Sequence, residues 1–222
     1  AMGINGTEVS KEAADMILTD DNFATIRAAV EEGRGVFDNL TKIIAWTLPT
    51  NLGGGLIVLL AILLGIALPI LPVQVLWINM TTVAALGIVL AVEHREPGIM
   101  RRPPRRPGAP ILTRALWARV LLVGALILVG AFGLYEWALA RGASVAVART
   151  VAVNTVVAVD IFSLLNCRSL RHSVLRIGPL TNRWAAVGIA AMVVLQAVFT
   201  YLPAANRVLA RTTPGVVVAG LT

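Results

Sequence analysis

Charged residues are scarce in this chain. Only 14% of its 222 residues are Asp, Glu, Lys or Arg, whereas 57% are hydrophobic and the mean hydropathy is +0.80. In soluble domains about a quarter of the residues are charged. Aromatic residues are also few, at 5%, so the apolar content is mainly Leu, Val, Ile and Ala, which suit helices that face lipid. The composition excludes an ordinary soluble domain and favours an integral membrane protein.

Cysteine is almost absent as well. The single thiol, Cys167, excludes an intramolecular disulfide framework and any metal site built from several cysteines. The residue ends an apolar run, where we expect an inert, packed thiol.

The charge that is present is mainly basic. A net charge of +7 and a pI near 11.0 would fit a nucleic-acid-binding protein. The arginines, however, cluster in the connections 94–114 and 168–183, between apolar runs. Cytoplasmic loops beside anionic lipid carry basic residues in this way. We therefore expect a lipid bilayer and no nucleic acid as a partner, with the N-terminus and both of these loops in the cytoplasm.

Long apolar runs make up most of the sequence. Five of them have about the twenty residues needed to cross the apolar core of a bilayer, and they lie at about 43–64, 73–92, 116–140, 145–165 and 184–202. A sixth run, at about 213–222, is too short to span. The predicted fold is an all-α polytopic membrane protein with five full transmembrane helices and a truncated sixth.

The first 22 residues lack this apolar character. They predict a short helix capped by Thr7, between strand segments at 1–3 and 16–18. So small an α/β unit cannot bury a core of its own. The chain also opens on Ala1 instead of Met, so we expect residues 1–22 to be the end of a larger domain.

A long helix is predicted next. From Phe23, with Asp21 or Asn22 as its cap, an amphipathic pattern runs without a stop signal into the first apolar run. We therefore expect a cytoplasmic stalk over 23–42 that continues directly into a membrane domain over 43–222.

A few polar side chains interrupt the spans. Asp160 lies deep in the fourth span, where an unpaired carboxylate is costly. Asn51 follows Pro49 in the first span, where proline removes a backbone donor, and Asn79 and Thr82 share one face of the second. Because hard cations prefer oxygen ligands, a candidate cation site consists of Asn51, Asn79, Thr82 and Asp160.

Another role is open to these polar groups. Asn and Thr side chains in membrane spans often join neighbouring helices by hydrogen bonds, and we expect this of Gln196. Glu93, at the cytoplasmic end of the second span, is a possible additional cation ligand.

Ordered motifs run through nearly the whole chain. They include 15–23 (DMILTDDNF), 28–34 (AAVEEGR), 50–53 (TNLG), 72–79 (PVQVLWIN), 96–105 (EPGIMRRPPR) and 160–162 (DIF). In this order they resemble the C-terminal part of type II P-type ATPases, the calcium, sodium/potassium and related cation pumps, of the bacterial type. The resemblance implies that residues 1–22 are a remnant of the HAD-like phosphorylation domain and that the spans are the fifth to tenth of such a pump, in a bacterial-type plasma membrane.

The resemblance also implies cation ligands. Asn51 falls on a fifth-span asparagine that binds the cation in calcium pumps, Asn79 and Thr82 on sixth-span ligands, and Asp160 on an eighth-span acidic ligand. Two carboxylates of the calcium pumps are missing, since their positions hold Gly54 and Val83. The identity of the ion is therefore open, and Glu93 would restore a charge if the site were shifted toward the cytoplasm.

The catalytic motifs of these pumps do not occur in the sequence. The chain lacks the phosphorylated aspartate of Asp-Lys-Thr-Gly-Thr, the magnesium motif Gly-Asp-Gly-x-Asn-Asp and the actuator motif Thr-Gly-Glu-Ser. We therefore assign no catalytic residue and no cofactor to this chain, and expect ATP and Mg²⁺ to bind the missing N-terminal part of an intact pump. The alternatives are a free-standing, non-catalytic channel or subunit and a non-functional gene fragment.

Overall fold

The structure, a computed structural model, describes residues 1–96, 98–105, 108–169 and 182–202. Within these residues it is built of helices and contains no β-strand. The elements in chain order are α1 (Glu8–Glu12), α2 (Phe23–Leu64), α3 (Pro72–Thr82), a π-helical segment (Val83–Gly87), α4 (Ile88–Ala91), a 3₁₀ turn (Ile99–Arg101), α5 (Arg114–Ala140), α6 (Val145–Cys167) and α8 (Arg183–Tyr201).

Five of the described helices are long and apolar enough to cross a membrane. They are Phe23–Leu64, Pro72–Ala91, Arg114–Ala140, Val145–Cys167 and Arg183–Tyr201. These helices cover the five predicted spans, except that the second and fifth were predicted to end one residue later, so the prediction of an all-α polytopic membrane protein is confirmed. The predicted sixth span, at 213–222, lies outside the described residues.

The chain divides into two compact units. The first unit consists of Ala1–Asn39 and His94–Ala109, and the second of Leu40–Glu93 and Pro110–Thr222. The predicted long helix is confirmed, since α2 runs without a break over 42 residues and contributes to both units. Its N-terminus is capped by Asn22, whose side-chain oxygen accepts a hydrogen bond from the amide of Ala24 at 3.0 Å.

In the first unit, α1 begins at its predicted cap, because the Thr7 hydroxyl accepts a hydrogen bond from the amide of Ser10 at 3.3 Å. The two predicted strands, however, are wrong in extent. They are reduced to a single parallel bridge between Met2 and Leu18. Two segments of about three residues are too short to form a stable ladder by themselves.

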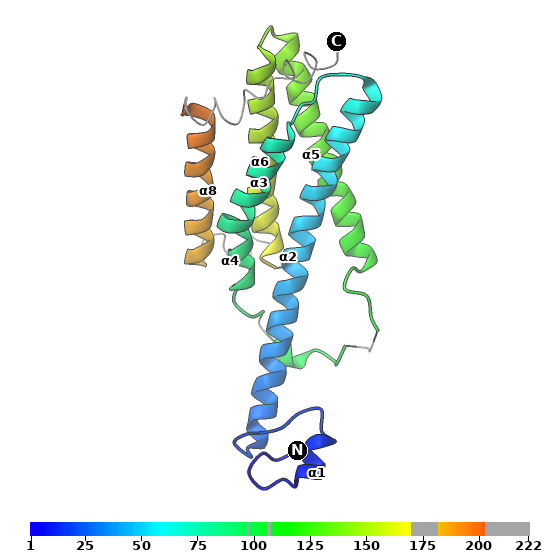
Figure 1. Ribbon diagram of the computed structural model, residues 1–222, viewed down its shortest axis with the longest axis vertical. Helices are drawn as coiled ribbons and strands as arrows, with labels where there is room; N and C mark the ends of the chain where they lie inside the picture. Colours follow the sequence, from blue (N-terminus) through cyan, green and yellow to red (C-terminus); the bar gives the residue numbers. More distant parts are fainter. Residues whose placement is uncertain (97, 106–107, 170–181, 203–222) are drawn as a thin grey trace, which may run out of the picture. The chain divides into compact units, whose positions relative to one another are not determined.

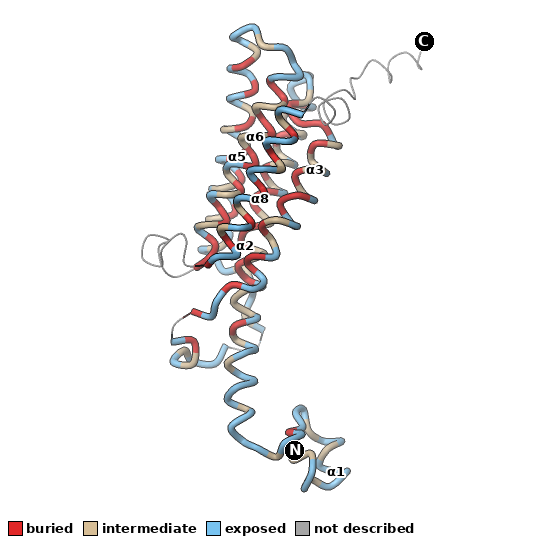
Figure 2. Tube along the Cα trace, turned by 90° about the vertical axis from the view of Figure 1, so that its left-hand side faces the viewer, coloured by how far each residue is buried: buried red, intermediate tan, exposed pale blue. Residues whose placement is uncertain are grey.

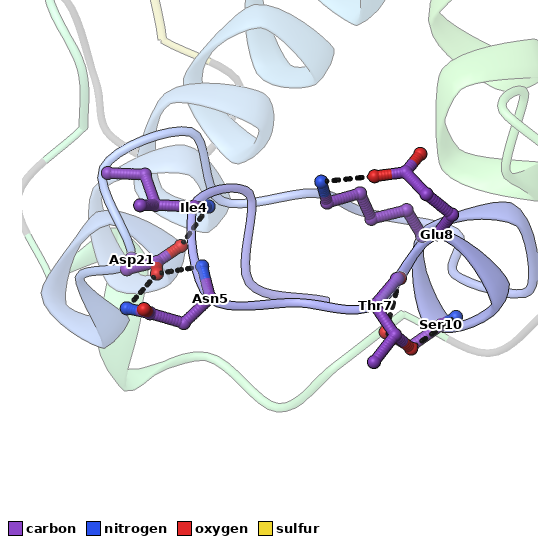
Figure 3. A network of polar contacts seen from close by, with 7 residues as sticks. Ile4, Asn5, Thr7, Glu8, Ser10 and Asp21 are labelled. Carbon is purple, nitrogen blue, oxygen red and sulfur yellow. Dashed lines mark hydrogen bonds and ion pairs between the residues drawn. The ribbon is translucent and has the colours of Figure 1, made fainter.

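Asp21 organises the loops of the first unit (Figure 3). Its carboxylate accepts hydrogen bonds from the amides of Ile4 and Asn5, at 2.9 and 2.8 Å, and from the Asn5 side chain at 2.7 Å. The Ile4 amide is the main reason that the pKa of Asp21 is lowered, because each of these bonds favours the ionised form. Asp21 also adopts φ +49°, a left-handed conformation that Asp tolerates better than most residues.

An ion pair and hydrogen bonds connect Ile99 and Arg102 to the first part of α2 within this unit. The Arg102 guanidinium donates to Asp38 at 2.6 Å and to Glu96 at 2.7 Å. Arg34 on α2 donates to the carbonyl oxygens of Ile99 and Arg102, at 2.9 and 2.8 Å. Both guanidinium groups thus connect α2 to a segment that is more than sixty residues away in the sequence.

In the second unit, the later part of α2 packs with α3, α4, α5, α6 and α8 in a helical bundle (Figure 1). The buried residues shown in Figure 2 are concentrated in this bundle, whereas α1 contains none. The core is mostly aliphatic and includes the fully buried Ile57, Leu86, Ile127 and Leu164.

Small residues allow two close approaches between these helices. A Cβ atom at Gly188 on α8 would lie 2.3 Å from the carbonyl oxygen of Ala85, in the π-helical segment. A Cβ atom at Gly53 on α2 would lie 2.6 Å from Ile127 on α5. Packing of backbone against neighbouring helices through small residues is typical of membrane proteins.

Candidate functional site

The backbone hydrogen bonding of α2 is interrupted at Pro49. This residue has no N–H to donate to the carbonyl group of Ala45. Directly after it, two polar side chains lie against carbonyl groups of the same helix. The Thr50 hydroxyl is 3.3 Å from the oxygen of Trp46, and the Asn51 amide donates to the oxygen of Thr47 at 3.2 Å. The helix thus presents two polar side chains inside an apolar stretch.

Asp160 on α6 is fully buried and faces this part of α2. Its Oδ1 atom accepts a hydrogen bond from the Thr50 hydroxyl at 2.7 Å, and its backbone oxygen accepts one from Trp46 Nε1 at 3.1 Å. Its Oδ2 atom is buried and has no hydrogen-bond partner among the described residues. A buried carboxylate oxygen without a partner is unfavourable unless a ligand completes its surroundings.

A small cavity of about 50 Å³ adjoins Thr50. Helices α2, α3 and α6 and the α2–α3 connection form its wall. The lining residues are Thr50, Asn51, Gly54, Gly55, Ile70, Val75, Ile78, Asn79 and Val156. A water molecule needs about 10–15 Å³ by this measure, so the cavity has room for one partly hydrated ion.

The structure brings together part of the predicted ligand set. Asn51 and Asn79 line the same cavity from two helices, and Asp160 is connected to it through Thr50. Thr82 is not among the lining residues, and its hydroxyl donates to the carbonyl oxygen of Ile78 at 2.6 Å.

Thr50 was missed by the sequence reasoning. Its place beside Asn51, one residue after a helix-interrupting proline, was the available signal. The contact with Asp160, 110 residues away in the sequence, has no local signature.

Glu93, the possible additional ligand, lies in a different polar cluster. Its carboxylate accepts hydrogen bonds from Nε and Nη2 of Arg168, both at 3.1 Å. The Asn182 side chain donates to the same carboxylate at 3.0 Å, and its oxygen caps α8 by accepting from the amide of Trp184. Glu93, Arg168 and Asn182 are all buried. The cluster joins the end of α4 to the end of α6 and the start of α8.

A third polar cluster joins α6 to α8. The side chain of Gln196 donates to Asn154 at 2.6 Å, and the Thr200 hydroxyl donates to the same Asn154 oxygen at 3.1 Å. The expectation that Gln196 forms an interhelical hydrogen bond is therefore confirmed.

The sequence also matches known proteins over most of its length. Residues 67–218 match the model of a protein family described as "Cation transporting ATPase, C-terminus". The chain belongs to the cation-transporting ATPases. This membership confirms the resemblance drawn from the ordered motifs, and the matched region covers α3 to α8.

Three relatives illustrate the range of similarity within the cation-transporting ATPases. "Probable cation-transporting ATPase F" of Mycobacterium tuberculosis is 59% identical over 94% of this chain and 23% of its own length. "Cation-transporting ATPase pma1" of Synechocystis is 43% identical over 96% of the chain and 24% of its own length. "Calcium-transporting ATPase" of Bacillus subtilis is 35% identical over 91% and 23%. The chain thus spans about a quarter of the length of these relatives.

Proposed function

We propose that this chain is the membrane transport portion of an ATP-driven cation pump and that the cavity beside Thr50 receives the transported cation. The observation that supports this most strongly is the state of Asp160. One oxygen of this buried carboxylate is bonded to the cavity wall, and the other has no partner among the described residues. Ionisable groups inside membrane spans are costly and commonly mark ion pathways.

The proposed ligands follow from the geometry of the cavity. The side-chain oxygens of Thr50, Asn51 and Asn79 are neutral ligands of the kind that hard cations take, and Asp160 supplies one negative charge. Thr82 is not a ligand in this proposal, because its hydroxyl donates to the carbonyl oxygen of Ile78 within α3. A site with one carboxylate does not by itself identify the ion.

Hydrolysis of ATP requires residues that this chain does not contain. The sequence holds no motif that fits ATP, Mg²⁺ or a phosphorylated aspartate, so no step of phosphoryl transfer is assigned to it. In the intact protein, we propose, the stalk part of α2 transmits the effect of hydrolysis to Thr50 and Asn51, which lie on the same helix. By itself the chain is inactive in this proposal.

The arginine-rich connections favour one orientation in the membrane. We propose that the N-terminus and residues 94–114 and 168–183 face the cytoplasm of a bacterial-type cell. Cysteines introduced at the exposed Arg101 and Arg141 test this, because Cys167 is buried. A reagent that does not cross membranes should label only Arg101→Cys in inside-out vesicles. Labelling of Arg141→Cys alone would show that the orientation is the opposite of the one proposed.

Two threonine variants test the cavity in the full-length ATPase. Hydrolysis of ATP is measured in inside-out vesicles against the concentrations of Na⁺, K⁺, Mn²⁺ and Ca²⁺. A hydrogen bond to a charged group contributes about 1.5–3 kcal/mol, so Thr50→Val should raise the half-stimulating concentration about ten- to a hundredfold. Thr82→Val is the matched control and should change it less than about threefold.

Two results would contradict the proposal. A larger effect of Thr82→Val than of Thr50→Val would favour the ligand set implied by the family resemblance over the cavity. If none of the four cations stimulated hydrolysis, the transport assignment itself would fail.

A further inference from the structure

Arg149 on α6 is a buried charge without an acidic partner in the described part of the chain. The residue is 4% exposed, and its Nε atom donates to the carbonyl oxygen of Leu68 at 3.0 Å. None of the ion pairs among the described residues includes it. An arginine guanidinium stays charged in proteins, and a buried charge that no opposite charge compensates is costly.

Arg149 lies on the same face of α6 as the candidate cation site. Val156 lines the cavity, and Asp160 binds Thr50 in its wall. These residues follow Arg149 by seven and eleven positions, which are about two and three turns of a helix and place all three on one side. All three are buried. At 1.5 Å per residue, Val156 is about 10 Å and Asp160 about 16 Å from Arg149 along the helix axis.

The contact between Arg149 and the α2–α3 connection also places this residue close to the cavity. Arg149 binds the oxygen of Leu68, and Ile70, two residues later, lines the cavity and is 1% exposed. The connection is also held by Tyr135, whose hydroxyl donates to the oxygen of Ala67 at 3.3 Å. The guanidinium is therefore fixed at the α2–α3 end of the cavity, with Asp160 toward the other end.

We infer that Arg149 sets the charge selectivity of the cavity by disfavouring divalent cations relative to monovalent ones. This inference rests on the proposed function. We take the axial rise between Arg149 and Val156, about 10 Å, as the separation between the guanidinium and a bound ion. Two unit charges at this distance, at an effective dielectric constant of about 20, repel each other enough to weaken binding of a monovalent cation on the order of tenfold. The repulsion scales with the charge of the ion, so the binding of a divalent cation is weakened on the order of a hundredfold. Arg149 thereby offsets part of the attraction of Asp160 and keeps the ion releasable.

The experiment uses the detergent-purified full-length ATPase with Na⁺ and Ca²⁺ as probes. The midpoint of thermal unfolding is measured against the concentration of each ion, since a ligand that binds the folded state raises this midpoint without any need for turnover. Arg149→Gln removes the charge but keeps an N–H group for Leu68, and Arg149→Lys keeps the charge. Arg141→Gln is the matched control, because Arg141 follows α5, is exposed and lies over the ring of Trp137.

Arg149→Gln should lower the apparent dissociation constant about tenfold for Na⁺ and about a hundredfold for Ca²⁺, whereas Arg149→Lys and Arg141→Gln stay within about threefold of wild type. If wild type responds to neither ion, Arg149→Gln should gain a response to Ca²⁺. The inference is overturned if Arg149→Lys behaves like Arg149→Gln, if Arg149→Gln changes the dissociation constants of Na⁺ and Ca²⁺ by the same factor, or if it changes neither. The midpoint without added ions shows whether each variant is folded.

Thr50→Val separates this inference from the proposed function. If Thr50→Val weakens the ion response about tenfold or more while Arg149→Gln leaves it unchanged, the cavity assignment stands and the role of Arg149 is wrong. If Thr50→Val leaves the ion response unchanged, the cavity assignment fails whatever Arg149→Gln does.

Discussion

Glu93 provides a sharp test of the structure, because a cation ligand and a member of a buried ion pair respond differently to the same change. Glu93→Gln removes the negative charge that faces Arg168 and leaves the guanidinium buried beside Asn182. Arg168 is 4% and Glu93 8% exposed, so solvent screening is weak. Removal of one partner from a buried ion pair typically costs about 3–5 kcal/mol.

Cys167 gives a local measure of this cost. The thiol is fully buried, directly precedes Arg168 and accepts a hydrogen bond from Arg119 at 3.4 Å. A thiol reagent reaches it only when the end of α6 opens, so its labelling rate follows the free energy of local opening. At 1.36 kcal/mol per tenfold change, Glu93→Gln should accelerate labelling by roughly two to four orders of magnitude in full-length protein whose other cysteines are replaced.

The controls separate the ion pair from a general effect. Glu136→Gln, at an exposed glutamate on α5, should leave the labelling rate unchanged. Glu93→Gln combined with Arg168→Gln should label more slowly than Glu93→Gln alone, because the double change removes the ion pair as a whole and leaves no buried guanidinium facing a neutral side chain at position 93. The reasoning would be refuted if Glu93→Gln changed labelling less than about threefold and instead raised the half-stimulating cation concentration, as expected of a ligand.

Two further predictions concern packing and pH. Gly188→Ala places a Cβ atom 2.3 Å from the carbonyl oxygen of Ala85 and should destabilise the protein by about 1–3 kcal/mol, whereas Gly54→Ala meets no atom within 4 Å and should not destabilise it, as thermal unfolding would show. Because hydrogen bonds lower the pKa of Asp21 below its ordinary value of 3.8, its stabilising contribution is complete above that value and is lost as the pH falls through the lowered pKa. The protection of the Ile4 amide against hydrogen exchange, measured relative to its intrinsic rate at the same pH, should therefore fall only below about pH 4, and loss of this protection already at pH 6 would contradict this cause.

The helices could be predicted from the sequence because their signals are local. Runs of about twenty apolar residues need no partner to be read as spans, and the caps at Thr7 and Asn22 lie within three residues of the amides that they bind. Asn51 and Asn79 also stood out, since amide side chains are conspicuous inside apolar runs.

The pairings between helices could not be predicted in this way. Thr50 meets Asp160 across 110 residues, and Glu93 meets Arg168 across 75. The proline before Thr50 marks its position, but nothing local shows that Thr50 lines a cavity whereas Thr82 binds its own backbone. Short strand patterns were misleading for a related reason, because a strand depends on neighbours that the local sequence does not specify.

Cation uptake by Asp160→Asn tests the central proposal most directly. The substitution keeps an oxygen for the Thr50 hydroxyl and removes a charge that is costly to bury, so folding should be unimpaired. ATP-driven uptake of Na⁺, K⁺, Mn²⁺ and Ca²⁺ is measured in inside-out vesicles that contain wild-type or Asp160→Asn full-length protein. We predict that wild type accumulates at least one of these cations and that Asp160→Asn loses this uptake while its thermal midpoint stays equal or rises. Undiminished uptake by folded Asp160→Asn protein would contradict the account.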